Sequence, residues 1–132
     1  MADLIRRLRV PCRVDFVRLA SYCGDESSGQ IRITKDLEEP VAGKDLLIVE
    51  DIVDTGLTLT RLVALLRQRQ PASLKVCALL DKPDRRRVPF AADYVGFSIP
   101  NKFVFGYGLD LDDYYRNLPF IGVVDLQKYT LE

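Results

Sequence analysis

The sequence contains no histidine and only three cysteines among its 132 residues. Without histidine, Ser-His-Asp triads, histidine general bases and histidine metal ligands are excluded. Cys12, Cys23 and Cys77 lie far apart in the sequence and form no CxxC pair, so neither a disulfide framework nor a zinc site is predicted. Any catalysis must therefore use other side chains, and we expect the protein to reside in the reducing environment of the cytoplasm.

The sequence also lacks an excess of charge of either sign and any long apolar run. Nineteen Lys and Arg residues balance nineteen Asp and Glu residues, so no bulk charge attracts nucleic acid or an acidic membrane. No apolar run approaches the ~18 residues that a membrane-spanning helix needs. A hydrophobic share of 48% and a length of 132 residues are typical of one domain with a buried core. We therefore expect a single domain, residues 1–132, that binds neither nucleic acid nor membrane.

Short apolar segments alternate with a helical pattern along the chain. Six segments have the composition of strands: 13–19, 30–35, 45–50, 74–80, 93–98 and 121–125. The segment 45–50 is a continuous apolar run, typical of a strand covered on both faces, and we expect it to be the central strand. Apolar residues recur at helical spacing from Leu59 to Leu66, before Pro71, and predict a helix. Strand, helix and strand in succession imply a parallel crossover, and therefore an α/β fold.

Three further segments are read from their composition. Met1, Leu4, Ile5 and Leu8 form one apolar stripe that predicts a short N-terminal helix. Residues 21–29 are small and polar, which predicts a surface loop. The three consecutive arginines at 85–87 are interpreted as a solvated loop, with contact to a partner as the alternative.

The most informative segment is 49–60, VEDIVDTGLTLT, where the predicted strand ends and passes through a turn into the predicted helix. Ligands of open α/β sheets bind at this position. Gly56 permits a tight turn, and the backbone amides from Thr55 to Thr58, at the start of a helix, can point together at an anion. The turn is therefore a candidate phosphate site.

Three carboxylates crowd the same turn. Glu50, Asp51 and Asp54 would repel a bare phosphate unless hydroxyl groups or a metal ion satisfy them. A ribose 5-phosphate offers a phosphate to the amides and a diol to the acids, and Mg²⁺ accepts carboxylate and water ligands. Two alternatives remain open: Asp54 and Thr55 merely cap the helix, or the chain is a receiver-type domain with a phosphorylated Asp. Receiver domains split their acids across several strands, whereas here the acids share one loop.

Several segments together resemble one family. VEDIVDTGLT resembles the phosphoribosyl-diphosphate signature of type I phosphoribosyltransferases. The segments LLDKP (79–83), DYVGFSIPNKFVFGYGLD (93–110), DDYYRNLP (112–119) and SYCGDESSG (21–29) resemble the hypoxanthine-guanine members of that family. The resemblance implies a Rossmann-like α/β fold with a central parallel sheet and a small C-terminal hood, approximately residues 99–132.

The resemblance also implies a reaction. The 5-phosphoribosyl group would pass from phosphoribosyl diphosphate to hypoxanthine or guanine, giving IMP or GMP and pyrophosphate, with Mg²⁺ as cofactor. Glu50 and Asp51 would hold the ribose hydroxyls and Mg²⁺, and Asp54 would act as acid and base toward the purine imidazole ring. The residues that would cradle the 5-phosphate are Asp54, Thr55, Gly56, Leu57 and Thr58.

Other matched positions are expected to bind the purine. Lys82 would donate to the 6-oxo group, which disfavours a 6-amino base. Phe103 would stack on the base, and the Val104 carbonyl would accept from the guanine amine. Asp110 would bind a second Mg²⁺. Patterns alone allow other readings, namely a solvated loop lysine at position 82 and core packing at 103–104.

The pyrophosphate and the closing loop complete the implied site. Arg116 would bind pyrophosphate, although it could instead pair with Asp112 or Asp113. Ser21 and Tyr22 would belong to a mobile loop that excludes water. The resemblance further implies a homodimer or homotetramer.

The sequence departs from the family at its start. Family members have an N-terminal segment and a first strand that ends in a Leu-Lys-Gly-like pyrophosphate loop, and nothing here matches it. We therefore expect this chain to lack one sheet strand and one wall of the diphosphate site. A non-catalytic nucleotide sensor and a xanthine-preferring relative are the alternatives to an active hypoxanthine-guanine enzyme.

Overall fold

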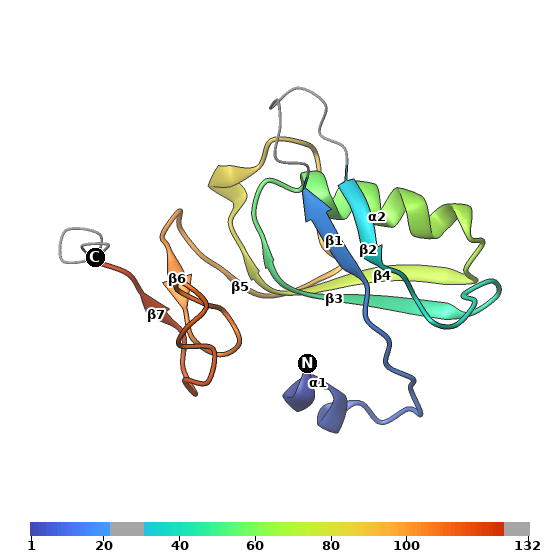
Figure 1. The fold of residues 1–132 in the computed structure, drawn as a ribbon, viewed down its shortest axis with the longest axis horizontal. Coiled ribbons are helices and arrows are strands. Elements are labelled where there is room, and N and C mark those ends of the chain that lie inside the picture. Colours follow the sequence, from blue (N-terminus) through green and yellow to red (C-terminus); the bar gives the residue numbers. More distant parts are fainter. Residues whose placement is uncertain (22–30, 126–132) are drawn as a thin grey trace.

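A computed structural model of the chain describes residues 1–21 and 31–125. Its centre is a three-stranded parallel sheet in the order β3-β4-β5 (Figure 1). The strands are β3 (Asp45–Val53), β4 (Ser73–Asp81) and β5 (Tyr94–Ser98). Helix α2 (Leu57–Gln68) connects β3 to β4, and a short 3-10 helix, η1 (Pro83–Arg85), follows β4. The strand, helix and strand predicted from the sequence are confirmed, and with them the parallel α/β fold.

The prediction that segment 45–50 is the central strand is wrong. β3 lies at the edge of the described sheet, and β4 lies in the middle. β3 is also not covered evenly on its two faces, because Leu47 is 42% exposed. In β4, by contrast, Val76, Ala78 and Leu80 are all buried. A continuous apolar run reports that a strand is largely apolar, but it does not report the order of strands in the sheet.

The core lies between α2 and the sheet. Leu59, Leu62 and Leu66 occupy one face of α2 and are each at most 4% exposed. They pack against Val76 and Ala78 of β4, which confirms the helix predicted from their spacing. This packing holds the N-terminus of α2 against the carboxyl ends of β3 and β4.

An antiparallel hairpin of β1 (Arg18–Ser21) and β2 (Ile31–Lys35) lies beside this core. The strand predicted over 13–19 is paired only from Arg18 onward. Before that point the Asp15 carboxylate accepts hydrogen bonds at 2.7 Å from the amides of Phe16 and Glu38, so a side chain takes the place of ladder partners.

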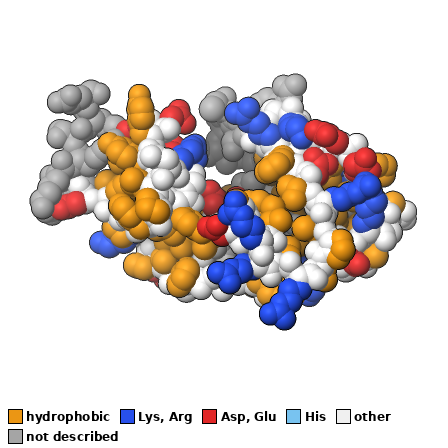
Figure 2. Space-filling model, turned by 90° about the horizontal axis from the view of Figure 1, so that it is seen from below, with side chains coloured by type: hydrophobic (Ala, Val, Ile, Leu, Met, Phe, Trp, Pro, Cys, Tyr) orange, Lys and Arg blue, Asp and Glu red, His pale blue; other side chains and the backbone are white. Residues whose placement is uncertain are grey.

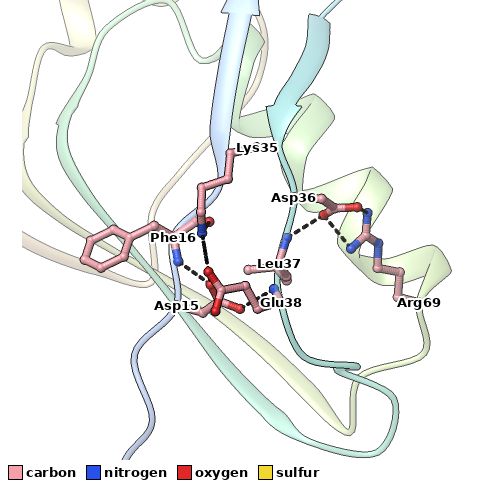
Figure 3. Close-up of polar contacts among 7 residues, drawn as sticks. All are labelled: Asp15, Phe16, Lys35, Asp36, Leu37, Glu38 and Arg69. Carbon is pink, nitrogen blue, oxygen red and sulfur yellow. Dashed lines mark hydrogen bonds and ion pairs between the residues drawn. The ribbon is translucent and has the colours of Figure 1, made fainter.

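A polar network continues from this point to helix α2 (Figure 3). Lys35 Nζ donates to the Phe16 carbonyl at 3.1 Å and pairs with Glu38 at 3.2 Å. The Asp36 carboxylate accepts two hydrogen bonds of 2.8 Å from the Arg69 guanidinium, at the C-terminal end of α2. The network fastens the hairpin to α2.

The N-terminal helix contacts the β6–β7 part of the chain. Helix α1 (Ala2–Arg7) is shorter than the predicted apolar stripe, and Met1 and Leu8 are exposed. Strands β6 (Val104–Phe105) and β7 (Gly122–Val123) pair antiparallel in a separate unit to one side of the sheet (Figure 1). The Tyr107 hydroxyl of this unit donates to the Asp3 carboxylate of α1.

The β6–β7 unit, residues 99–125, has an apolar surface, which Figure 2 shows as a broad hydrophobic area at one end of the molecule. Its exposed large side chains are Phe103, Tyr107, Tyr114, Tyr115, Phe120 and Val123. In the described part of the chain no helix is long and apolar enough to cross a bilayer.

Candidate functional site

The acid turn, residues 50–58, follows the buried part of β3 and leads into α2. Within the described residues α2 has no side-chain N-cap: its N-cap is Gly56, which has φ +82°. The Thr55 hydroxyl accepts only a long 3.4 Å contact from the Leu57 amide. Capping of the helix by Asp54 or Thr55 is therefore a poor explanation of these residues, and the first-turn amides face the position where an anion can bind.

Glu50 and Asp51 lie side by side at the start of the acid turn. Burial of Glu50, together with the neighbouring Asp51 carboxylate, raises the pKa of Glu50 to about 7. Asp51 is exposed and accepts a 2.7 Å hydrogen bond from the Ile52 amide. Two carboxylates that repel each other in this way are stabilised by a proton, a hydroxyl donor or a cation.

Lys82 lies next to this turn because strands β3 and β4 are in register. Val53 pairs with Asp81, and the Lys82 amide donates to the Val53 carbonyl at 2.9 Å. Lys82 is 8% exposed, which is unusual for a lysine and argues against a solvated loop residue. The carboxyl ends of two parallel strands thus bring the acid turn and a buried cation together.

The interpretation of residues 85–87 as a solvated loop holds for the exposed Arg85 and Arg87 but is wrong for Arg86, whose side chain is only 16% exposed. Arg85 Nε donates to the Asp54 carboxylate at 3.0 Å, and Arg86 Nη1 donates to the Asp54 carbonyl at 2.6 Å. The Arg87 amide donates to the Thr55 carbonyl at 2.9 Å. Three consecutive arginines carry no sequence signal for which of them turns inward, so the sequence could not predict that this loop covers the acid turn.

Apart from Lys82, the predicted purine residues and the predicted pyrophosphate residue Arg116 lie in the β6–β7 unit. Phe103 is 49% exposed, so a place in the core is excluded, and its carbonyl accepts from the Val124 amide at 2.9 Å. Val104 lies in β6 and is half-buried. Arg116 pairs with Asp110 at 3.0 Å and more distantly with Asp113 at 3.7 Å.

The loop that carries Asp110 and Arg116 is built from unusual backbone conformations. Tyr107, Asp112, Asp113 and Tyr115 all have φ between +53° and +68°. Arg116 also donates from Nη1 to the Gly108 carbonyl at 2.9 Å. Side chains rarely adopt such angles, and clusters of them recur at functional sites. Ser21 ends β1, while Tyr22 and the rest of the predicted closing loop lie outside the described residues.

The residues present fit a hydrated Mg²⁺ better than a closed metal cage. Across residues 1–21 and 31–125, no three His, Cys, Asp or Glu side chains form a ready-made metal cluster. Mg²⁺ commonly binds through one or two carboxylates, several waters and substrate oxygens. Glu50 and Asp51 supply such a pair, and their mutual repulsion is the charge that a divalent cation would neutralise.

Comparison with known proteins gives the same assignment for nearly the whole chain. Residues 1–112 match the family of the phosphoribosyl transferase domain. The chain is 50% identical over 130 residues to the hypoxanthine-guanine phosphoribosyltransferase of Bacillus subtilis, a match that covers 98% of this chain and 72% of that protein.

Solved structures agree. A Staphylococcus aureus hypoxanthine phosphoribosyltransferase superposes with a TM-score of 0.92 at 46% identity, over 98% of this chain and 71% of that one. A Trypanosoma cruzi hypoxanthine phosphoribosyltransferase variant in complex with the product IMP superposes with a TM-score of 0.89 at 52% identity, over 96% of this chain and 66% of that one. The chain therefore belongs to the phosphoribosyltransferase family.

Proposed function

We propose that this protein transfers the 5-phosphoribosyl group of phosphoribosyl diphosphate to hypoxanthine or guanine, forming IMP or GMP and pyrophosphate. The relatives named above carry hypoxanthine or hypoxanthine-guanine phosphoribosyltransferase as their names. The observation that carries the proposal is the junction of β3 and β4, where the acid turn lies beside the buried Lys82. A phosphate cradle next to a cation that selects a 6-oxo group suits a 6-oxopurine nucleotide.

The acid turn would hold the sugar phosphate. The backbone amides at the start of α2 would bind the 5-phosphate, and Glu50 and Asp51 would bind the ribose hydroxyls with Mg²⁺. When bound, Mg²⁺ supplies positive charge beside the hydroxyls and the diphosphate. Anchoring both ends of the ribose leaves its anomeric carbon as the part that moves toward the base.

Asp54 would be the acid and base of the reaction. Its carboxylate is half-exposed and already within hydrogen-bond distance of the Arg85 guanidinium, at 3.0 Å. A purine that presents its imidazole N–H to Asp54 replaces Arg85, and the carboxylate then accepts that proton as the ring becomes nucleophilic. No histidine is required for this step.

The β6–β7 unit would complete the site around the base and the leaving group. Lys82 donates to the 6-oxo oxygen, Phe103 stacks on the purine ring, and the Val104 carbonyl accepts from the 2-amino group of guanine. Asp110 assists the second Mg²⁺, and Arg116 binds pyrophosphate, which requires exchange of their 3.0 Å ion pair for the ligand. Ser21 and Tyr22 belong to the segment that would close over the site.

The test is an assay of the chain with phosphoribosyl diphosphate, Mg²⁺ and hypoxanthine or guanine. The variant is Asp54→Asn, and the matched control is Asp84→Asn, which changes an exposed aspartate of η1. Loss of a positioned base lowers kcat by about 100-fold or more, whereas the control retains activity. Equal turnover by Asp54→Asn and the wild type would contradict the assignment of Asp54.

The same preparation separates the alternatives. Tight GMP binding by a wild-type chain without turnover identifies a nucleotide sensor. Competition among hypoxanthine, guanine and xanthine identifies a xanthine-preferring relative. Absence of both turnover and nucleotide binding would refute the proposed function altogether.

We also propose that the chain forms a homodimer or homotetramer. The apolar side chains exposed on the β6–β7 unit support association, because monomeric proteins rarely expose large apolar areas (Figure 2). Sedimentation equilibrium at several protein concentrations measures the mass directly. A monomer at all concentrations would contradict this proposal without affecting the assignment of the reaction.

A further inference from the structure

We propose that Arg86 is a positioning residue for Asp54. Its side chain joins the acid turn to the C-terminal end of β4. The inference rests on the proposed function, because it gives Arg86 a part in the same reaction. It concerns how the backbone that carries Asp54 is held, and Arg86 itself is not assigned a contact with substrate.

The Arg86 guanidinium spans two elements. Its Nη1 donates to the Asp54 carbonyl at 2.6 Å, and its Nη2 donates to the Asp81 carboxylate. Asp81 is the last residue of β4 and pairs with Val53 of β3. Because the donors of a guanidinium are held in a rigid planar fork, the two acceptors are kept in a fixed relation to each other.

Burial and packing distinguish Arg86 from its neighbour Arg85. The side chains of Arg86 and Asp81 are 16% and 21% exposed, whereas those of Arg85 and Asp54 are both 41% exposed. A Cβ atom built on Gly56 would lie only 3.1 Å from Arg86 Cδ. The aliphatic part of Arg86 therefore packs over Gly56, while its guanidinium binds the Asp54 carbonyl. One side chain thus contacts the acid turn at two positions.

The neighbouring arginines make contacts of other kinds. Arg85 binds the carboxylate of Asp54, the group that must become free for a purine. Arg87 reaches the turn only through its backbone amide in the bond to Thr55, which any residue except proline would retain. Arg86 is the one of the three whose side chain binds the backbone of the turn.

The contact fixes two groups of the proposed reaction relative to each other. Asp54 lies on the turn, and Lys82 directly follows Asp81 on the other element. With Arg86 in place, the proposed acid-base residue Asp54 and the lysine that would bind the 6-oxo group keep a fixed position relative to each other. Without it the turn is still tied by the Lys82 and Arg87 amides, but the Asp54 carbonyl loses its hydrogen bond to Arg86. Misplacement of a reacting group by about 1 Å can cost on the order of 100-fold in rate.

The kinetic test compares Arg86→Gln, Arg86→Lys and Arg67→Gln, the last of which changes an exposed arginine on α2. We expect Arg86→Gln to lower kcat by about 10- to 100-fold, with a smaller change in the KM for hypoxanthine. Arg86→Lys retains the charge but offers one donor group in place of the fork, so kcat falls to an intermediate value. Arg67→Gln stays within about twofold of the wild type.

A second variant removes the other end of the same contact. Asp81→Asn is expected to lower kcat in the same direction as Arg86→Gln, and the double variant is expected to be no worse than the more impaired single variant. Additive losses in the double variant would overturn the proposal, because Arg86 and Asp81 would then act independently. Wild-type kcat in Arg86→Gln would overturn it as well.

Hydrogen exchange supplies a readout that does not depend on turnover. Peptides covering residues 51–60 are expected to exchange faster in Arg86→Gln, or in Arg86→Lys if the former does not fold, than in Arg67→Gln. An inactive wild type with this exchange difference would refute the proposed function while leaving the fastening of the turn supported. An active wild type whose Arg86 variants exchange and turn over normally would refute the inference alone.

Discussion

Gly56 is a residue on which two separate constraints act. Its φ of +82° lies in the left-handed region that only glycine adopts without cost. A Cβ atom at this position would also lie 3.0 Å from Phe90 Cβ and 3.1 Å from Arg86 Cδ. The conformation starts helix α2, and the lack of a side chain lets residues 85–90 close over the acid turn.

The variant Gly56→Ala is expected to show both costs. Its control is Gly43→Ala, at φ +70°, where a Cβ atom would meet nothing within 4 Å. Left-handed strain alone lowers the free energy of unfolding by about 1 kcal/mol in Gly43→Ala, and strain plus contact lowers it by at least about 2 kcal/mol in Gly56→Ala. Urea unfolding measures both. Equal losses would show that residues 85–90 move aside freely.

Glu50 gives a prediction about pH. Its pKa in the folded chain is raised from 4.5 to about 7, so between these values the folded state holds a proton that the unfolded state has lost. By linkage the free energy of unfolding therefore falls as pH rises through this window. Glu50→Gln removes this decline, which amounts to roughly 1–3 kcal/mol between pH 5 and pH 8 without Mg²⁺.

Urea titrations of the wild type and Glu50→Gln at the two pH values provide the measurement. The variant is expected to be the more stable protein at pH 8 and to lose this advantage at pH 5. Parallel pH profiles for the two proteins would mean that Glu50 titrates at its ordinary value. Such a result would also remove the argument that a cation relieves the crowding of Glu50 and Asp51.

At the scale of elements, local patterns predicted which segments are helix and strand but not how the strands are ordered. The spacing of Leu59, Leu62 and Leu66 located α2 because a helix repeats its buried face every few residues. The apolar run of β3 did not reveal that β4 is the middle strand, because both strands are rich in apolar residues. Strand order depends on contacts between distant segments, which no local pattern contains.

The candidate site could be predicted only in part, because it too depends on contacts between distant segments. The acids, glycine and threonines of residues 50–58 are contiguous, so one segment of sequence revealed them. Lys82 was assigned to the site only because its segment resembles the family, and its burial became evident only from the register of β3 with β4. The contacts of Arg85 and Arg86 with Asp54 span 31 and 32 residues and follow from the path of the loop after β4.

The network in Figure 3 gives a prediction about the hairpin. The Arg69 guanidinium and the Leu37 amide hold the pKa of Asp36 below its ordinary value of 3.8. The stability that this contact contributes is present above that value and is lost as pH falls through the lower pKa of the folded chain. Asp36→Asn is therefore expected to cause a small loss of stability at pH 7 that shrinks toward pH 3.

Thermal unfolding at both pH values checks this expectation. The control is Glu39→Gln, which removes an exposed partner of Arg13 and Lys44 at 3.2 and 3.6 Å. Exposed ion pairs of this kind contribute little, so the control is expected to unfold like the wild type. A loss in Asp36→Asn that persists unchanged at pH 3 would show that the carboxylate charge is not its source.

At the scale of the whole molecule, two parts of the described chain are joined by a short segment between β5 and β6. The sheet with α2 forms one part, and the β6–β7 unit forms the other, after β5. The proposed site needs both, because Asp54 and Lys82 lie in the first and Phe103, Asp110 and Arg116 in the second. Contacts that restrain the β6–β7 unit therefore bear on the geometry of the site as a whole.

One such contact joins residues that are 104 positions apart: the Tyr107 hydroxyl donates to the Asp3 carboxylate of α1. Tyr107→Phe removes the donor and keeps the ring, so we expect faster hydrogen exchange in α1 and in residues 106–111, with the sheet unchanged. The control is Tyr114→Phe, which changes a tyrosine that is 71% exposed. Exchange in α1 that is the same in both variants would show that the hydroxyl of Tyr107 does not hold the helix. Faster exchange in Tyr107→Phe alone would instead mean that the first helix of the described chain restrains the unit that carries the proposed purine and pyrophosphate residues.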